Sequence, residues 1–132
     1  MITRETDYAI RTLMALAQRE AGSRSVSMAI LAEQMEIPYR FLRKLAKKMV
    51  AAGLIESRRG KGGGLSLARP PKSVSLYDAV AAIAPGSATI SACLLDRKRC
   101  TRTPFCRAHE EFRVIQDDVN RRLKQITLDS LA

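Results

Sequence analysis

Three cysteines and the only histidine of this 132-residue chain lie within one short segment. Cys93, Cys100 and Cys106 are separated by six and then five residues, and His109 follows the last cysteine by three. That last spacing puts Cys106 and His109 on one face of a helix. Because thiolates and imidazoles are ligands for zinc and for iron–sulfur clusters, the four groups predict one metal centre.

The spacing of the cysteines favours a cluster over a single zinc ion. Zinc sites more often have ligand pairs about two to four residues apart, whereas the wider gaps here suit a larger group on a flexible loop. Basic neighbours favour the thiolate form and offset the charge of an anionic cluster. These neighbours are Arg97, Lys98, Arg99, Arg102 and Arg107.

Positive charge is concentrated in the middle of the chain. The formal net charge is +10, from 23 Lys and Arg against 13 Asp and Glu. Residues 38–72 alone hold ten basic residues and a single acid, Glu56, which is a local excess of +9. A basic surface of this density binds a polyanion such as double-stranded DNA through the release of counterions.

The elements around this charge have the pattern of a winged helix-turn-helix. A helix that begins at Ser27 is broken at 36–38, because the residue before Pro38 avoids the helical region. A basic helix follows and ends at Gly53, and a glycine-rich hairpin comes next. The predicted elements are helices at 3–20, 27–35, 38–52 and 76–84, strands at 54–58 and 65–67, and a long helix at about 104–127.

The predicted DNA-binding residues lie on the third helix and on the hairpin tip. Glycine lets the backbone approach a duplex closely, and basic side chains there reach the minor groove or the phosphates. The opposite face of the helix is expected to be core: Phe41, Leu42, Leu45, Met49 and Val50. The DNA-binding set is Pro38, Tyr39, Arg40, Arg43, Lys44, Lys47, Lys48, Arg58, Arg59, Gly60, Lys61 and Gly62.

The rest of the chain is predicted to be a loop followed by a dimerisation helix. A loop of 20 residues, 86–105, is unusual in a compact domain and indicates a functional segment. Apolar residues at steps of three and four on the long helix suit a dimer interface, with packing on its own domain as the alternative. The interface set is Phe112, Ile115, Val119, Leu123 and Ile126. The predicted division is a winged helix-turn-helix region (1–85), a cluster-binding loop (86–105), and a dimerisation helix with tail (106–132).

Other classes of protein are disfavoured. No run of about 18 apolar residues is present, so we expect no membrane span. The first ten residues carry charges and no apolar signal core follows them, which predicts a cytoplasmic protein. With one histidine and no P-loop an enzyme is not expected, and a nucleophilic Cys106 beside His109 would lack an orienting acid.

The combined pattern resembles the IscR/NsrR type of iron–sulfur transcription regulators, the Rrf-type family. The resemblance covers nearly the whole chain and implies a mainly α fold with a small β-wing and a long C-terminal dimerisation helix. It implies a homodimeric repressor whose affinity for double-stranded DNA depends on its cluster. The matching stretches are ITRETDYAIRTLMALA, FLRKLAKKMVAAGLIES, RGKGGGLSLARP, SLYDAV, the cysteine loop and ITLDSLA.

The resemblance also implies that Cys93, Cys100 and Cys106 are cluster ligands. In IscR-like members with a [2Fe–2S] cluster the fourth ligand is a histidine that His109 matches. In NsrR-like members with a [4Fe–4S] cluster it is an aspartate of the other subunit that Asp7 matches, so the fourth ligand stays open.

The chain also departs from the family pattern. The first cysteine gap is one residue longer than is expected of close relatives, and Arg43 stands where IscR-like members can carry an acid that faces the DNA, so no operator sequence is carried over. The signal, whether nitric oxide, redox state, iron or cluster status, is not implied either. The alternative is a cluster-free winged-helix regulator that uses the cysteines as a thiol redox switch or a zinc site.

Overall fold

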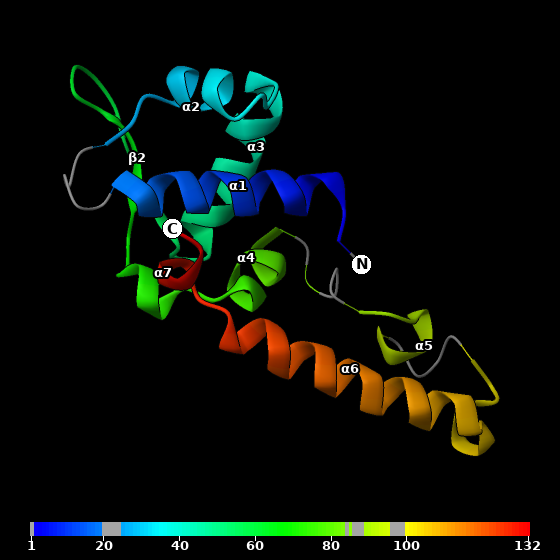
Figure 1. The fold of residues 1–132 in the computed structure, drawn as a ribbon. Coiled ribbons are helices and arrows are strands. Elements are labelled where there is room, and N and C mark those ends of the chain that lie inside the picture. Colours follow the sequence, from blue (N-terminus) through cyan, green and yellow to red (C-terminus); the bar gives the residue numbers. More distant parts are fainter. Residues whose placement is uncertain (1, 20–24, 84, 86–88, 96–99) are drawn as a thin grey trace.

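The computed structural model describes residues 2–19, 25–83, 85, 89–95 and 100–132. The described chain is mainly helical with one two-stranded antiparallel sheet, as the sequence predicts (Figure 1). In chain order the elements are α1 (Arg4–Arg19), α2 (Met28–Gln34), α3 (Tyr39–Ala51), β1 (Ile55–Arg58), β2 (Gly64–Leu67), η2 (Pro71–Ser73), α4 (Leu76–Ile83), α5 (Ala92–Leu95), η4 (Thr103–Phe105), α6 (Arg107–Gln125) and α7 (Leu128–Leu131).

The hydrophobic core surrounds α1. This helix packs against α3, α4, α7 and β2, and its residues Ala9, Leu13 and Leu16 are buried on one face. Each fully buried leucine contributes about 1.5–3 kcal/mol relative to an exposed one. The other large side chains that are fully buried include Leu31, Leu42, Leu45, Met49, Leu54, Ile55, Leu65, Val74, Val80 and Leu128.

Side-chain caps fix the starts of two helices where the sequence predicts them. The Thr3 hydroxyl accepts the backbone N–H of Thr6 at 3.3 Å at the start of α1. At α4 the Ser75 hydroxyl accepts the N–H of Asp78 at 3.2 Å, and the Asp78 carboxylate accepts the N–H of Ser75 at 2.9 Å. This reciprocal capping box satisfies N–H groups that the first turn of a helix leaves unbonded.

The turn between α2 and α3 is made without glycine. Glu36 has a φ of 53°, and the N–H of Ile37 bonds to the Ala32 carbonyl at 2.9 Å, which buries Ile37. Of the residues predicted to be core on α3, Phe41 and Val50 are 45% and 41% exposed, so that part of the prediction is wrong. The buried arc of α3 is narrow, and these two positions lie just beyond its edges.

The wing is a short antiparallel hairpin. β1 pairs with β2 in the register Ile55 with Leu67 through Arg58 with Gly64. Leu65 also exchanges two backbone hydrogen bonds with Val26, each 2.8 Å long, which attaches the wing to the segment before α2. An added Cβ on Gly64 would lie 2.2 Å from the Val26 carbonyl oxygen, so this contact requires glycine.

The segment predicted as one loop, 86–105, contains the short helices α5 and η4. Each is a single turn and has no apolar period that sequence reasoning could detect. The long helix spans Arg107–Gln125 instead of 104–127, because Pro104 belongs to η4 and Thr127 is extended and bridges to Ser75. None of the described helices is long and apolar enough to cross a membrane.

The end of the chain returns to the winged region. The Leu128 N–H bonds to the Val74 carbonyl at 2.9 Å, and the Leu76 N–H bonds to the Ile126 carbonyl at 2.9 Å. Leu128 is fully buried in the core, and α7 lies beside α1 (Figure 1). The tail that follows α6 therefore packs on the 1–85 region, and α6 is anchored there at its C-terminal end.

Candidate functional site

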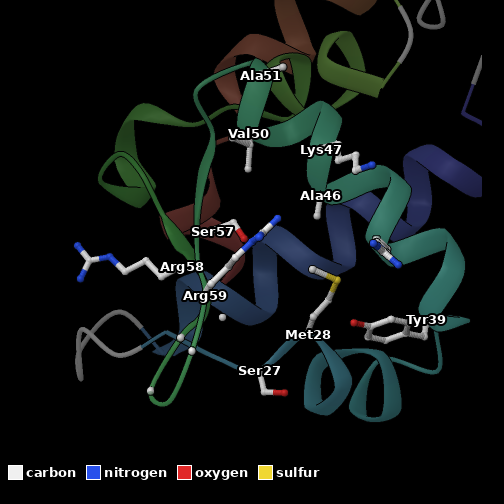
Figure 2. Close-up of a pocket in the computed structure, with 15 residues that line it drawn as sticks. Ser27, Met28, Tyr39, Ala46, Lys47, Val50, Ala51, Ser57, Arg58 and Arg59 are labelled. Atoms are coloured by element: carbon white, nitrogen blue, oxygen red, sulfur yellow. The ribbon is translucent and has the colours of Figure 1, made fainter.

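α3 and the wing border an open groove of ≈ 930 Å³ (Figure 2). Arg43 and Lys47 lie one turn apart on the groove side of α3, and Arg59 reaches from the wing across the groove, while Arg58 points away from the other labelled side chains. The less polar part of the lining comes from Met28, Tyr39, Ala46 and Val50. Cationic side chains around an apolar floor suit phosphates at the edge of a duplex and base edges within it.

The structure divides the basic residues of α3 between two sides. Lys44 and Lys48 do not line the groove; their ammonium groups lie 3.4 and 3.6 Å from the carboxylate oxygens of Glu5 on α1. Sequence reasoning did not predict this role of Glu5. The sequence shows only an acidic residue near the start of the first helix, and the packing of that helix on the basic α3 is needed to find the ion pairs. Of the predicted set, the groove lining contains Tyr39, Arg43, Lys47, Arg58, Arg59, Gly60 and Gly62, while Pro38, Arg40 and Lys61 are exposed outside it.

The structure brings Cys93 and His109 together across two helices. The Cys93 sulfur on α5 lies 3.4 Å from Nδ1 of His109 on α6 and 3.1 Å from the Ser91 hydroxyl. Cys106 immediately precedes α6, and its carbonyl accepts the His109 N–H at 3.2 Å. Cys93, Cys100 and Cys106 are each half-buried. Within the described part of the chain, no three Cys, His, Asp or Glu side chains are grouped as a metal ion requires.

The other residues predicted around the cysteines are placed as follows. Asp7 lies in the first turn of α1, and its carboxylate pairs with Arg11 at 2.8 Å. Arg102 and Arg107 are exposed, and the remaining predicted basic neighbours lie outside the described residues.

One buried amide next to this site was not predicted. Gln116, on α6, is 9% exposed, and its Oε1 accepts the Ile90 N–H at 2.7 Å. Its Nε2 donates to Oδ1 of Asn120 at 2.9 Å. The sequence offers a single hint of this bond, which is that Gln116 is a polar residue within an apolar stripe. Nothing in the nearby sequence indicates its partner, which lies 26 residues away.

Ion pairs cover the outer face of α6 next to His109. Arg113 hydrogen-bonds the Glu110 carboxylate through Nε at 3.1 Å and through a second guanidinium nitrogen, and these bonds lower the pKa of Glu110. The same contact raises the pKa of Arg113. Both side chains are exposed, so the pair keeps this face charged and adds little to stability.

The predicted interface residues of α6 differ in burial. Phe112 and Ile115 are 42% and 47% exposed, and their neighbour Val114 is 45% exposed. Val119 and Leu123 are half-buried because the C-terminal part of α6 packs on α4, where Lys124 also lies 4.7 Å from the Tyr77 ring centre. The uncovered apolar surface is thus in the N-terminal half of α6.

Comparison with known proteins identifies the family. The model of Rrf2, described as an iron-dependent transcriptional regulator, matches residues 2–132. The chain belongs to the Rrf2 family. The transcriptional repressor NsrR of Streptomyces coelicolor is 31% identical over 130 residues, covering 98% of this chain and 86% of that protein.

Solved Rrf2-type structures have the same fold. The global cysteine regulator CymR of B. subtilis superposes with a TM-score of 0.77 at 24% identity, covering 100% of this chain and 95% of CymR. IscR of T. potens superposes with a TM-score of 0.78 at 24% identity, covering 99% and 85% of the two chains. The winged-helix prediction is confirmed, and the relatives are DNA-binding transcription regulators and not enzymes.

Proposed function

We propose that this Rrf2-family chain is a homodimeric repressor in the cytoplasm whose affinity for double-stranded DNA depends on an iron–sulfur cluster. The ligands are Cys93, Cys100, Cys106 and His109. The observation that carries the proposal is the 3.4 Å contact between the Cys93 sulfur and His109 Nδ1. It joins α5 to α6, although the two residues are 16 positions apart in the sequence.

The donor set fits such a group in its chemistry. Three half-buried thiols and one imidazole are the ligand types found on iron–sulfur clusters, and Arg102 and Arg107, close in sequence to Cys100 and Cys106, carry positive charge. When bound, the cluster would make the protein sensitive to redox state, nitric oxide or iron, because each can oxidise the cluster or change whether it is present. The four residues would hold it at the N-terminal end of α6, where that helix contacts α5.

The contact with Cys93 favours His109 as the fourth ligand. The partner subunit's Asp7 is the competing fourth ligand, and the family resemblance alone leaves both open. Asp7 has a partner within its own helix, Arg11, whereas the His109 ring already faces a thiol. A histidine ligand needs no contribution from the second subunit.

DNA binding is assigned to the groove between α3 and the wing. In a dimer two such grooves face successive turns of one operator, which explains why a regulator of this kind depends on its subunit arrangement. A path from the cysteine site to the groove runs along α6, which packs on α4 and is attached through the tail to residues 74–76. Movement of α6 relative to its partner helix changes the spacing of the grooves.

Anaerobic purification followed by absorption and Mössbauer spectroscopy tests the cluster. We expect a coloured protein whose iron and sulfide are lost in the separate variants Cys93→Ala, Cys100→Ala and Cys106→Ala. His109→Ala should change the spectrum and shorten the cluster lifetime, while Asp7→Ala leaves both as in the wild type. The reverse result would transfer the fourth-ligand role to the partner's Asp7. A wild-type protein without iron would overturn the proposal.

A second candidate function is a cluster-free regulator that senses through its thiols or through zinc. The observation in its favour is that the described residues contain the Cys93–His109 contact but no group of three ligands. This candidate predicts a colourless anaerobic protein. Its DNA affinity would then change with thiol oxidation or with bound zinc, which elemental analysis and titration with oxidant distinguish.

A further inference from the structure

The Cys93–His109 contact needs something to hold the two elements together. Cys93 lies on α5, a helix of a single turn, whose own hydrogen bonds cannot fix its position. His109 lies in the first turns of α6, a helix of 19 residues. A hydrogen bond from the Ile90 N–H to the Gln116 amide oxygen, 2.7 Å long, connects the segment before α5 to α6.

The position of Gln116 on α6 is suited to this task. It follows His109 by seven residues, which is close to two helical turns, so both side chains lie on the same side of the helix. Ile90 precedes Cys93 by three residues. The bond at Gln116 therefore limits how far the chain between Ile90 and Cys93 moves away from the face of α6 that carries His109.

The Gln116 amide is held at both ends, by the Ile90 N–H at its oxygen and by Asn120 at its nitrogen. The Gln116 Nε2 donates to Asn120 Oδ1 at 2.9 Å, one turn further along α6. The Ile90 N–H can only donate, so a rotated Gln116 amide would place its NH₂ group against another donor and lose the Ile90 bond. Because Gln116 is only 9% exposed, bulk water does not replace the lost bond readily.

We propose that Gln116 is the positioning residue of the cysteine site: its amide oxygen holds Ile90 against α6 and thereby keeps Cys93 beside His109. The inference rests on the proposed function for the role of the two ligands. It adds that the affinity of the site depends on a side chain that is not itself one of the proposed ligands. Residues that orient metal ligands change metal affinity about 10–100-fold when they are replaced.

Three variants at two positions of α6 test this role. Gln116→Leu removes the acceptor at similar volume, Gln116→Glu keeps an acceptor for the Ile90 N–H, and Gln125→Leu makes the same change at an exposed position. After anaerobic reconstitution we expect the visible absorption of Gln116→Leu to decay about tenfold faster than that of the wild type. Gln116→Glu should restore most of the lifetime, and Gln125→Leu should match the wild type.

Two measurements on the cluster-free protein separate the positioning role from the proposed function. Hydrogen exchange at the Ile90 amide and alkylation of Cys93, each read by mass spectrometry, should both be about tenfold faster in Gln116→Leu than in Gln125→Leu. If Gln116→Leu does not fold, Asn120→Ala leaves the amide but removes its orienting partner, and we expect a smaller acceleration.

The outcomes are distinguishable. A wild-type protein without a cluster overturns the proposed function, and the exchange and alkylation rates still decide the role of Gln116. Equal rates at Ile90 and Cys93 in Gln116→Leu and the wild type overturn the positioning role. So does a cluster lifetime that Gln116→Leu leaves unchanged or that Gln116→Glu does not restore.

Discussion

The turn between α2 and α3 of the helix-turn-helix depends on the backbone conformation of one residue, Glu36. Among the described residues other than glycine, it alone has a positive φ, 53°. The left-handed conformation costs a residue with a Cβ about 1–2 kcal/mol. The turn keeps it because the next residue, Ile37, is then directed into the core, where it is 3% exposed.

Replacing Glu36 with glycine should stabilise the protein. We expect Glu36→Gly to raise the free energy of unfolding by about 0.5–1 kcal/mol, because relief of the left-handed strain exceeds the entropy that glycine loses on folding. The matched change Glu33→Gly, at an exposed position within α2, should lower it by about 1 kcal/mol. Urea unfolding measures both, and a destabilised Glu36→Gly would contradict the strain argument.

The features of single residues that sequence reasoning could foresee are the local ones. Ser75 caps α4 and Gly53 adopts the left-handed φ of 73°, because both depend on neighbours within a few residues. The positive φ of Glu36 had no such signal, since glycine or asparagine is the usual residue there. The Gln116–Ile90 bond could not be predicted for another reason, because its two residues are distant in sequence and come together only when the chain folds.

At the scale of elements, the packing of α1 on α3 pairs some of the basic residues of α3 and leaves others for the groove. Glu5 lies within 3.4 and 3.6 Å of the ammonium groups of Lys44 and Lys48, so these lysines are directed to α1 and partly neutralised. Such half-exposed pairs contribute only about 0–1 kcal/mol to stability. We expect a larger effect on DNA binding, because Glu5 would compete with phosphates for the two cations.

Glu5→Gln should therefore strengthen DNA binding. Each lysine released to a phosphate steepens the dependence of log affinity on log salt by about 0.9, so two lysines per protomer give a measurable increase. Glu111→Gln, at an exposed position of α6, makes the same change in net charge outside the groove and serves as the control. Binding of Glu5→Gln no tighter than that of Glu111→Gln at low salt would contradict the competition.

The elements themselves were predictable to different degrees. The periods of α1, α3 and α6 and the glycine-rich wing were readable, because amphipathic spacing and turn residues act locally. The burial of α7 was not, because four residues with one buried leucine carry no period. At the cysteine site, sequence reasoning named the donor types, but only the packing of α5 on α6 indicates that Cys93 meets His109.

At the scale of the whole molecule, the two halves of α6 have different surroundings. The C-terminal half packs on α4 and ends at the anchored tail, whereas the N-terminal half extends away from the winged region with α5 beside it (Figure 1). Phe112, Val114 and Ile115 are each more than 40% exposed on this half. Three large apolar residues on one exposed segment favour an interface with a second copy of the chain.

Ile115→Asp should separate the proposed dimer. A carboxylate on this surface would be buried without a partner in the dimer and solvated in the monomer, so we expect dissociation to increase about 100-fold or more. Sedimentation over a range of concentrations measures the change, and Gln125→Glu adds a negative charge elsewhere on α6 as the control. If Ile115→Asp sediments as the wild type does, this half of α6 is not the interface.

The wing and α3 together should make DNA binding strongly dependent on salt. A dimer that neutralises about 6–10 phosphates loses about 10³–10⁵-fold in affinity between 50 and 200 mM salt. Replacing Arg59 and Lys61 with alanine removes four cations per dimer, which should reduce the salt slope by about 3–4. Because phosphate contacts carry no sequence information, the affinities for operator and for unrelated DNA should fall alike.

The double variant Arg121→Ala with Arg122→Ala is the control: it removes the same charge from exposed positions of α6 and should leave the salt slope unchanged. An equal slope in the wing variant and this control would mean that the wing does not contact the backbone of the duplex.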